Sequence, residues 1–170
     1  IAQNMAPGFN WDFVSEEWNI MPRNINDELR DEADRMADYD KEIEVYASDI
    51  DPEMVEIAKR NAEEVGLGDI IQFNVKDVNT LTIDSEGPVA LVGNPPYGER
   101  IGDREEVEEM YRYIGSLMKQ HPYLSTYILT SNKEFEYLVN RKATKHRKLF
   151  NGYIECTYYQ YWGKKPDFKN

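Results

Sequence analysis

The sequence predicts an α/β fold, in which a parallel sheet flanked by helices ends in an antiparallel hairpin. Through most of the 170 residues, short apolar strand-like runs alternate with amphipathic helical stretches. Such alternation is typical of a parallel sheet with helices on both of its faces. Near the end, two strand-like runs flank Asn151-Gly152, and Asn-Gly between such runs indicates a two-residue hairpin turn. At this length we expect a single domain, residues 1–170.

The individual elements follow from the spacing of apolar residues and from the residues at helix ends. We expect Asn24 to cap the first helix, and Asp51 and Pro52 suit the cap and first position of the second. Gly66 suits a left-handed helix end. In chain order we predict helices at residues 25–39, 52–65, 107–118 and 134–139, and strands at 43–50, 70–75, 88–92, 125–130, 144–150 and 153–162. Three aromatic residues near the start are expected mainly in the core: Trp11, Phe13 and Trp18.

The composition narrows the classes of protein. There are 32 Asp and Glu against 20 Lys and Arg, a net charge of -12, which argues against a protein that coats nucleic acid but leaves room for a local basic patch. No apolar run approaches the roughly 18 residues needed to cross a bilayer, and no basic-then-apolar leader opens the chain, so we expect a cytoplasmic protein without membrane contact. Cys156 is the single cysteine, and neither His121 nor His146 has a partner at metal-ligand spacing, so we expect no metal site.

Three predicted strands end in polar residues, Asp49, Asp77 and Asn94, and ligands bind at the carboxyl ends of strands in parallel sheets. The carboxylate of Asp49 is an acceptor-only group that suits the hydroxyl hydrogens of a ribose, although Asp49 and Asp51 also suit helix capping. Asp77 suits the amino group of an adenine, or an ordinary turn. Together these residues predict a nucleotide-binding edge of the sheet.

The most specific motif is Asn94-Pro95-Pro96-Tyr97, directly after an apolar strand. Consecutive prolines donate no backbone hydrogen bonds and hold φ near roughly -65°, which makes a rigid loop that presents carbonyl oxygens. With the Asn94 amide oxygen, these carbonyls form an acceptor pair for an aromatic NH₂ group, so that the nitrogen lone pair is drawn out of the ring system. Tyr97 is expected to stack on the base, a contact worth about 1–3 kcal/mol in nucleic-acid sites. A proline-rich turn is the alternative for a bare Asn-Pro-Pro.

The motif resembles the [Asn/Asp/Ser]-Pro-Pro-[Tyr/Phe/Trp] signature of S-adenosylmethionine-dependent methyltransferases that modify exocyclic amines of adenine or guanine. Longer blocks resemble, in order and spacing, the THUMP-associated class I RNA guanine-N2 methyltransferases, especially the bacterial 23S rRNA type: residues 4–9, 13–18, 48–52, 94–100 and 147–152. The resemblance implies a class I, Rossmann-like methyltransferase fold with a C-terminal antiparallel β-hairpin. It also implies S-adenosylmethionine as the cofactor and methylation of a guanine N2 amine in 23S rRNA.

Residue roles are implied by the same resemblance. Asp49 would bind the cofactor ribose, Ile50 would pack on its adenine, and Asp77 with Val78 would read the adenine edge. Four adjacent residues would hold the target base, with Asn94 also bordering the cofactor: Asn94, Pro95, Pro96 and Tyr97.

Part of the family pattern is absent from this chain. Residues 1–9 match the end of the helix that follows the family's glycine-rich cofactor loop, and that loop, the first strand before it and the N-terminal THUMP module are missing. The family's first strand lies between its second and fourth, so those two strands are not expected to pair here. We therefore expect the C-terminal part of a longer protein, completed by upstream sequence or another polypeptide, and inactive by itself.

A basic cluster stands out in this acidic chain: Arg141, Lys142, Lys145, His146, Arg147 and Lys148. Lys145 and Arg147 are candidates for contacts with RNA phosphate, and Arg100 is another, while a charged edge strand is the alternative. The motif alone does not separate guanine N2 in rRNA from guanine N2 in tRNA or adenine N6 in DNA. The absent loop leaves a non-catalytic RNA-binding remnant as a further alternative.

Overall fold

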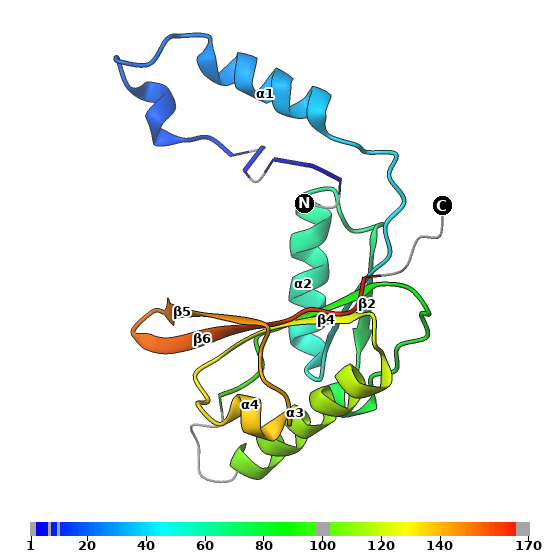
Figure 1. Ribbon diagram of the computed structural model, residues 1–170. Helices are drawn as coiled ribbons and strands as arrows, with labels where there is room; N and C mark the ends of the chain where they lie inside the picture. The colour runs from blue at the N-terminus through cyan, green and yellow to red at the C-terminus, as the bar shows by residue number, and fades with distance from the viewer. Residues whose placement is uncertain (1–2, 7, 10, 98–102, 166–170) are drawn as a thin grey trace. The chain divides into compact units, whose positions relative to one another are not determined.

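The computed structural model describes residues 3–6, 8–9, 11–97 and 103–165. The chain forms two compact units, Ile1–Lys76 and Asp77–Asn170 (Figure 1). Within the described ranges, no helix is long and apolar enough to cross a membrane.

The first unit is built around one strand–helix–strand segment. Its elements are the 3₁₀ helix η1 (Val14–Glu17), α1 (Ile25–Met36), β1 (Val45–Asp49), α2 (Pro52–Glu64) and β2 (Ile71–Val75). The strands β1 and β2 pair in parallel, with Asp49 opposite Val75 at their carboxyl ends. Helix α2 connects them, packs against both, and buries Val55 and Ala62. The parallel pair places the end of β1 at a sheet edge, as strand–helix alternation predicts.

The ends of α2 follow the predicted capping chemistry. The Oδ1 atom of Asp51 accepts a hydrogen bond from the backbone N–H of Glu53 at 2.8 Å, and Pro52 takes the first helical position. After the helix, Gly66 adopts φ +73°, a left-handed conformation that a residue without Cβ enters at little cost.

The segment before β1 differs from its prediction. Helix α1 ends at Met36 rather than residue 39, because Ala37 has extended backbone angles, and no residue of α1 is buried. The side chains of Trp11, Phe13 and Trp18 are 64%, 47% and 57% exposed, so the expectation that they lie in the core was wrong. Among the described residues of this unit, no helix or strand covers the apolar surface of these three side chains. The segment is held instead by polar contacts, including an ion pair between Arg30 and Glu16.

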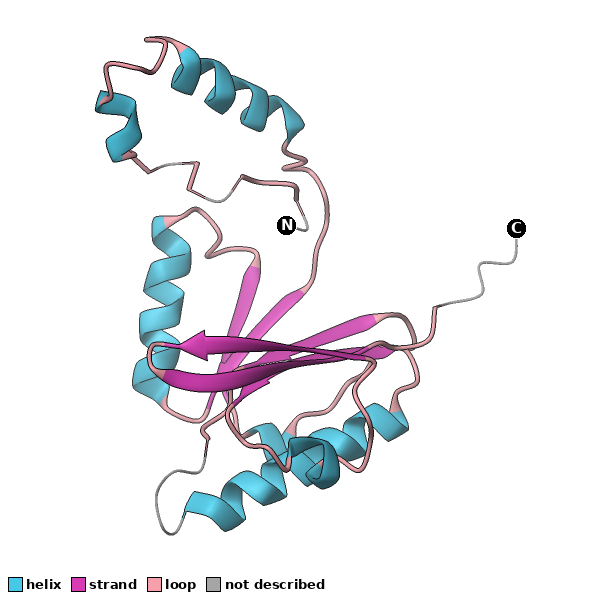
Figure 2. Ribbon diagram, turned by 60° about the vertical axis from the view of Figure 1, so that its left-hand side comes forward, coloured by secondary structure: helices cyan, strands magenta, loops and turns pink. Residues whose placement is uncertain are grey.

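The second unit holds a four-stranded mixed sheet. Its elements are the 3₁₀ helix η2 (Val78–Thr80), β3 (Val89–Gly93), α3 (Asp103–Gln120), β4 (Leu124–Thr130), α4 (Phe135–Leu138), β5 (Lys145–Asn151) and β6 (Ile154–Tyr161). The strand order is β3-β4-β6-β5, with β3 parallel to β4 and the other neighbours antiparallel. Figure 2 shows the long hairpin of β5 and β6 in this sheet.

Helices α3 and α4 cover one face of this sheet and enclose the main core (Figure 1). Alternate residues of β4 are fully buried, which is the period-two pattern of a strand with one face on a core. Phe135 of α4 packs against Tyr111 with ring centroids 4.8 Å apart, and against Tyr159 at 5.0 Å. Gly115 of α3 is required by packing, since a Cβ there would lie 2.4 Å from the Val139 carbonyl oxygen.

The hairpin turn is shifted by one residue from its predicted place. Asn151 still pairs with Ile154, so the two turn residues are Gly152 and Tyr153 rather than Asn151 and Gly152. Gly152 has φ +60°, and Asn151 is not among the residues with positive φ. Glycine at the first turn position is the pattern of a type II′ turn, whereas an Asn-Gly turn of type I′ would need positive φ at both residues. Asn151 is therefore the last residue of β5.

Strands β1 and β3 do not pair in the described residues, because β1 belongs to a two-stranded sheet and β3 to the four-stranded one. The family resemblance predicted this separation.

Candidate active site

The predicted amine-binding loop begins where β3 ends. Gly93 closes β3, and residues 94–97 leave the edge of the sheet as an irregular segment, with Asn94 and Pro96 exposed and Pro95 and Tyr97 half-buried. The two prolines cannot continue the ladder, since they have no backbone N–H. The loop therefore begins at the carboxyl end of β3, the position at which parallel sheets bind ligands.

Side-chain hydrogen bonds join this loop to the hairpin. The Tyr97 hydroxyl donates to Oδ1 of Asn94 at 2.9 Å, and the Nδ2 group of Asn151 donates to the Tyr97 hydroxyl at 3.2 Å. Burial, together with the neighbouring thiol of Cys156, raises the pKa of Tyr97 above its usual value. The phenol therefore stays protonated at neutral pH and remains a donor to Asn94.

A second anchor holds the loop from the core side. The hydroxyl of Tyr111, a residue with no exposed surface, donates to the Pro96 carbonyl at 3.1 Å and lies 2.9 Å from the Thr130 hydroxyl. Burial raises the pKa of Tyr111, so this hydroxyl also stays protonated. The Pro96 carbonyl is thus occupied by a donor. The Pro95 carbonyl, in contrast, has no donor among the described residues.

The loop thus offers two acceptors to a ligand. An amide oxygen has two lone pairs, and Tyr97 uses one of those on Asn94, so one remains beside the Pro95 carbonyl. Both groups accept and neither can donate, which suits an NH₂ group with two hydrogens to place. The hydroxyl of Tyr97 is a third polar group at the same loop, a contact that the sequence did not predict.

Asp49 and Ile50 lie in the first unit, at the end of β1. The Oδ1 atom of Asp49 accepts from the backbone N–H of Asp51 at 2.9 Å, and Oδ2 has no partner among the described residues. Ile50 is 69% exposed although it is large and apolar. The carboxylate of Asp49 is thus fixed with one oxygen open, beside an exposed aliphatic side chain, while the ribose and adenine contacts of these two residues stay a prediction.

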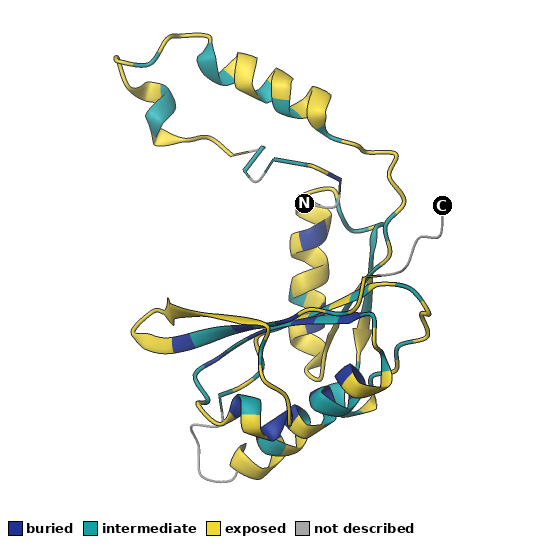
Figure 3. Cartoon of the chain, viewed as in Figure 1, coloured by how far each residue is buried: buried dark blue, intermediate teal, exposed yellow. Residues whose placement is uncertain are grey.

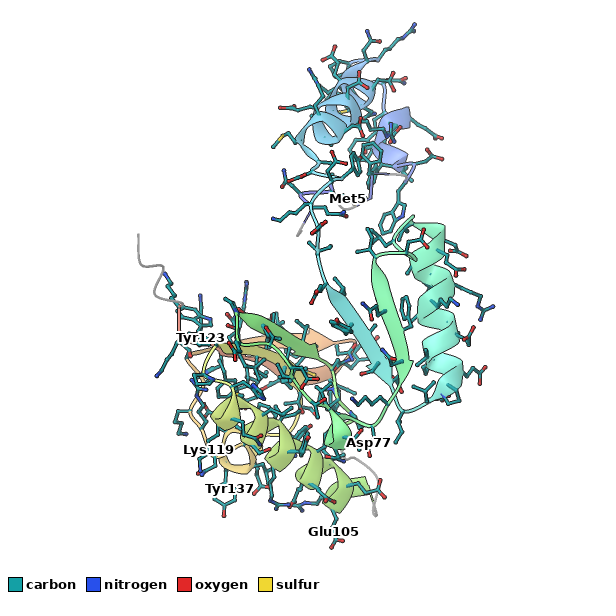
Figure 4. The ribbon with its side chains drawn as sticks, turned by 90° about the vertical axis from the view of Figure 1, so that its right-hand side faces the viewer. Met5, Asp77, Glu105, Lys119, Tyr123 and Tyr137 are labelled. Carbon is teal, nitrogen blue, oxygen red and sulfur yellow. The ribbon has the colours of Figure 1, made fainter. Side chains whose placement is uncertain are left out.

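Asp77 and Val78 open the second unit, and Figure 4 labels Asp77 there. The Oδ1 atom of Asp77 accepts from the backbone N–H of Asn79 at 2.9 Å, so this side chain caps η2. Val78 is half-buried and packs against the core of this unit. The capping contact leaves the second oxygen of Asp77 for a ligand, while the adenine-reading role of both residues stays a prediction.

The basic residues of the hairpin fall into two groups. Lys148 forms an ion pair with Glu155, and Lys142 forms one with Glu136. Lys145 and Arg147 stand on the other face of β5, two residues apart, and neither has an ion-pair partner among the described residues. Every residue of β5 is exposed (Figure 3). The third phosphate candidate, Arg100, lies outside the described residues.

No group of three or more potential metal ligands occurs in the ranges that the structure describes. Cys156 is fully buried, as expected for a small core residue.

Sequence reasoning missed three residues of the site: Asn151, Tyr111 and Thr130. Each was assigned to a turn, a helix interior or a strand, and each contacts the loop or its anchor through a side chain. For Tyr111 and Thr130 a chemical signal was available, since hydroxyl groups on otherwise apolar core faces need partners.

Comparison with known proteins identifies the family of the chain. Residues 1–160 match the UPF0020 family, described as an RMKL-like methyltransferase domain. "Putative RNA methyltransferase YpsC" of Bacillus subtilis (strain 168) is 52% identical over 96% of this chain and 42% of that protein. Ribosomal RNA large subunit methyltransferase K/L of Shewanella baltica (strain OS155) is 36% identical over 93% of this chain and 23% of its own length. The chain thus spans less than half the length of these relatives.

Two solved structures share the fold and much of the sequence. SMU.472, "a putative methyltransferase complexed with SAH", superposes with a TM-score of 0.86 at 38% identity, covering 97% of this chain and 44% of that one. A predicted N6-adenine-specific DNA methylase from Listeria monocytogenes str. 4b F2365 superposes with a TM-score of 0.82 at 45% identity, covering 95% and 41%. S-adenosylmethionine is the cofactor of this domain, since SAH is what it becomes after methyl transfer. The chain belongs to the UPF0020 family of RMKL-like methyltransferase domains.

Proposed function

We propose that this protein methylates the exocyclic N2 amine of a guanine in 23S rRNA. The loop of residues 94–97 carries the proposal, because the Asn94 amide oxygen keeps one lone pair beyond the bond from Tyr97, and no described residue donates to the Pro95 carbonyl. Relatives named as ribosomal RNA large subunit methyltransferases support an rRNA substrate. The activity concerns the complete natural protein, of which this chain supplies the acceptor loop.

The proposed chemistry depends on alignment. S-adenosylmethionine supplies a methyl group on a positively charged sulfur, which is already activated for transfer. The guanine amine is a weak nucleophile because its lone pair is delocalised into the ring. Asn94 and Pro95 would hold both amine hydrogens and so leave the lone pair directed away from the ring system. The proton leaves nitrogen after attack, so the reaction needs no strong base in the protein.

We further propose that Lys145 and Arg147 contact RNA phosphates. A target base has to leave its stack to reach a loop at the sheet edge, and phosphate contacts would hold the strand while it does so. Both cations are exposed and lie on the hairpin whose last β5 residue, Asn151, is hydrogen-bonded to Tyr97. Arg100 is proposed for the same role from its place after the motif. Tyr97 is proposed to stack on the base once the base has entered.

A second candidate is methylation of adenine N6 in DNA. The Listeria monocytogenes relative bears the name of an N6-adenine-specific DNA methylase, and adenine N6 is an aromatic amine of the same kind. Guanine N2 in tRNA is a third target with the same chemistry. A non-catalytic RNA-binding remnant would instead lack measurable affinity for the cofactor in the complete protein.

The decisive variant is Asn94→Ala in the complete natural protein. Loss of one acceptor that acts on the reacting group is expected to lower the rate of methyl transfer by roughly 10²–10³-fold, while cofactor affinity stays close to wild type. The measurement is transfer of labelled methyl groups to 23S rRNA, tRNA and DNA, with calorimetry for the cofactor. Mass spectrometry of nucleosides from a deletion strain identifies the modified base.

The matched control is Asn61→Ala, which removes an exposed asparagine from α2. It is expected to leave both the rate and cofactor affinity unchanged. Near-normal turnover in Asn94→Ala would contradict the amine-holding role. Labelling of DNA but not RNA would favour the adenine alternative.

A further inference from the structure

Asn151 reaches the candidate active site because the hairpin turns one residue later than the sequence predicts. As the last residue of β5 it pairs with Ile154, so Asn151 is not one of the two turn residues. Its Nδ2 group instead donates to the hydroxyl of Tyr97, which lies 54 residues earlier in the chain. The hydroxyl in turn donates to Oδ1 of Asn94. These three side chains form a directed relay from the hairpin to the amine acceptor.

The direction of the relay follows from counting hydrogens. A phenol has one hydrogen, so a tyrosine that receives a hydrogen bond from an amide N–H is free to donate its own hydrogen elsewhere. That hydrogen needs an acceptor, and the Asn94 side chain offers one only if its oxygen, not its NH₂ group, faces Tyr97. The amide orientation of Asn94 is therefore set by the donor at residue 151.

We propose that Asn151 is a positioning residue for methyl transfer, which fixes the orientation of the Asn94 amide through the hydroxyl of Tyr97. The inference rests on the proposed function, because the amide oxygen matters only if Asn94 holds an amine. An Asn94 amide turned by half a rotation would present NH₂ to the substrate amine, and two donors would then face each other.

The surroundings of Tyr97 support a relay that is complete at neutral pH. The phenol faces Asn94, Asn151 and the thiol of Cys156, and burial keeps its pKa above the usual value, so its hydrogen is present. The loop backbone is held separately, by the bond from Tyr111 to the Pro96 carbonyl. Loss of the relay is thus expected to change an amide orientation without moving the loop.

The test is the isosteric variant Asn151→Asp in the complete natural protein. A carboxylate accepts only, so the Tyr97 hydrogen is expected to turn toward residue 151 and release the Asn94 amide. The expected kcat falls by about tenfold to a hundredfold, with little change in KM for the cofactor. Asn151→Ala removes the donor, so the direction of the Tyr97 hydrogen is no longer fixed but nothing draws it away from Asn94, and a smaller loss is expected. The matched control is Asn74→Asp, the same change at an exposed position in β2.

A double-variant cycle with Tyr97→Phe separates the relay from a purely structural effect. Without the hydroxyl, residue 151 has no connection to Asn94, so adding Asn151→Asp to Tyr97→Phe is expected to change kcat no further. Additive losses would overturn the proposal, as would equal losses in Asn151→Asp and Asn151→Ala.

A readout that does not depend on turnover keeps the two proposals distinguishable. Titration of Tyr97, followed by NMR of its labelled ring carbon, is expected to give a higher pKa in Asn151→Asp than in wild type, because an N–H donor to the phenolate is replaced by a negative charge. An unchanged titration would overturn the relay. If Asn151→Asp raises the Tyr97 pKa in this way but the wild-type protein methylates neither RNA nor DNA, the proposed function alone is refuted.

Discussion

Asp49 shows how one local contact prepares a side chain for a ligand. The bond from the Asp51 N–H to Oδ1 fixes the carboxylate at the end of β1 and leaves Oδ2 open within the described structure. Asp49→Ala is expected to weaken cofactor binding by about tenfold or more, since a hydrogen bond to a charged group contributes about 1.5–3 kcal/mol. Isothermal titration calorimetry with S-adenosylmethionine measures this change in the complete natural protein.

The neighbouring variant Asp51→Ala separates binding from folding. It removes the cap of α2 and is expected to lower the free energy of unfolding by about 0.5–2 kcal/mol, with little effect on cofactor affinity. If Asp49→Ala bound the cofactor as tightly as wild type, the ribose assignment would have to be abandoned.

At the scale of single residues, the sequence could identify functional side chains that lie within a few positions of one another. Asn94 and Tyr97 are three residues apart in one motif, which predicts that they share a site. The hydrogen bond between them confirms that the two side chains are in contact. Asn151 could not be found in the same way. Its partner is 54 residues distant, and the bond exists only because the tertiary fold brings the end of β5 to the loop after β3.

The hairpin shows the limit of prediction at the scale of an element. Both strands were predicted to within a few residues, because two strand-like runs flank a turn signal that contains a glycine. The turn was placed one residue early, because Asn-Gly fits a type I′ turn while Gly152 alone fits a type II′ turn. Local propensity does not choose between them, whereas the bond from Asn151 to Tyr97 favours the observed register.

Strand β5 carries the prediction for RNA binding. Replacing both Lys145 and Arg147 with alanine is expected to raise KM for RNA. It is also expected to reduce the slope of log affinity against log salt concentration by roughly two units, since each neutralised phosphate contributes about one unit. Binding measured over a range of salt concentrations gives this slope. The maximal rate with saturating RNA is expected to change little.

A matched double variant tests whether position or net charge matters. Lys59→Ala with Arg60→Ala also removes one lysine and one arginine, both exposed on α2. It is expected to leave the salt slope unchanged, because these residues are not on the hairpin. Equal slopes in the two double variants would show that β5 has no specific role in binding RNA.

At the scale of the whole chain, the alternation of strands and helices predicted the parallel pairs β1–β2 and β3–β4, and the Asn-Gly signal predicted the terminal hairpin. The separation of β1 from β3 was also expected. In the family, these two strands belong to one sheet only because another strand lies between them and pairs with both. Burial was harder to predict for the first unit. Trp11, Phe13 and Trp18 look like core residues by type, but an aromatic side chain is buried only where another element covers it, and sequence alone does not place that element.

The core of the second unit predicts a specific loss of stability in alkali. Burial raises the pKa values of Tyr111, Tyr159 and Tyr161, because a phenolate is poorly solvated in an apolar core. The unfolded chain releases these protons near pH 10 and the folded unit only at higher pH. Their contribution is thus complete below about pH 10 and is lost as pH rises further.

Tyr161→Phe provides the test, since Tyr161 has no exposed surface. Above about pH 10 the free energy of unfolding is expected to decline less steeply with pH than in wild type, by roughly 1.4 kcal/mol per pH unit, because one fewer proton is released on unfolding. Denaturant unfolding followed by circular dichroism at several pH values gives this slope. Tyr153→Phe, at the fully exposed hairpin turn, is the control and is expected to leave the slope unchanged, since this side chain is surrounded by solvent in the folded unit as well as in the unfolded chain. A Tyr161→Phe slope equal to that of wild type would mean that the Tyr161 phenol is as well solvated in the folded unit as in the unfolded chain.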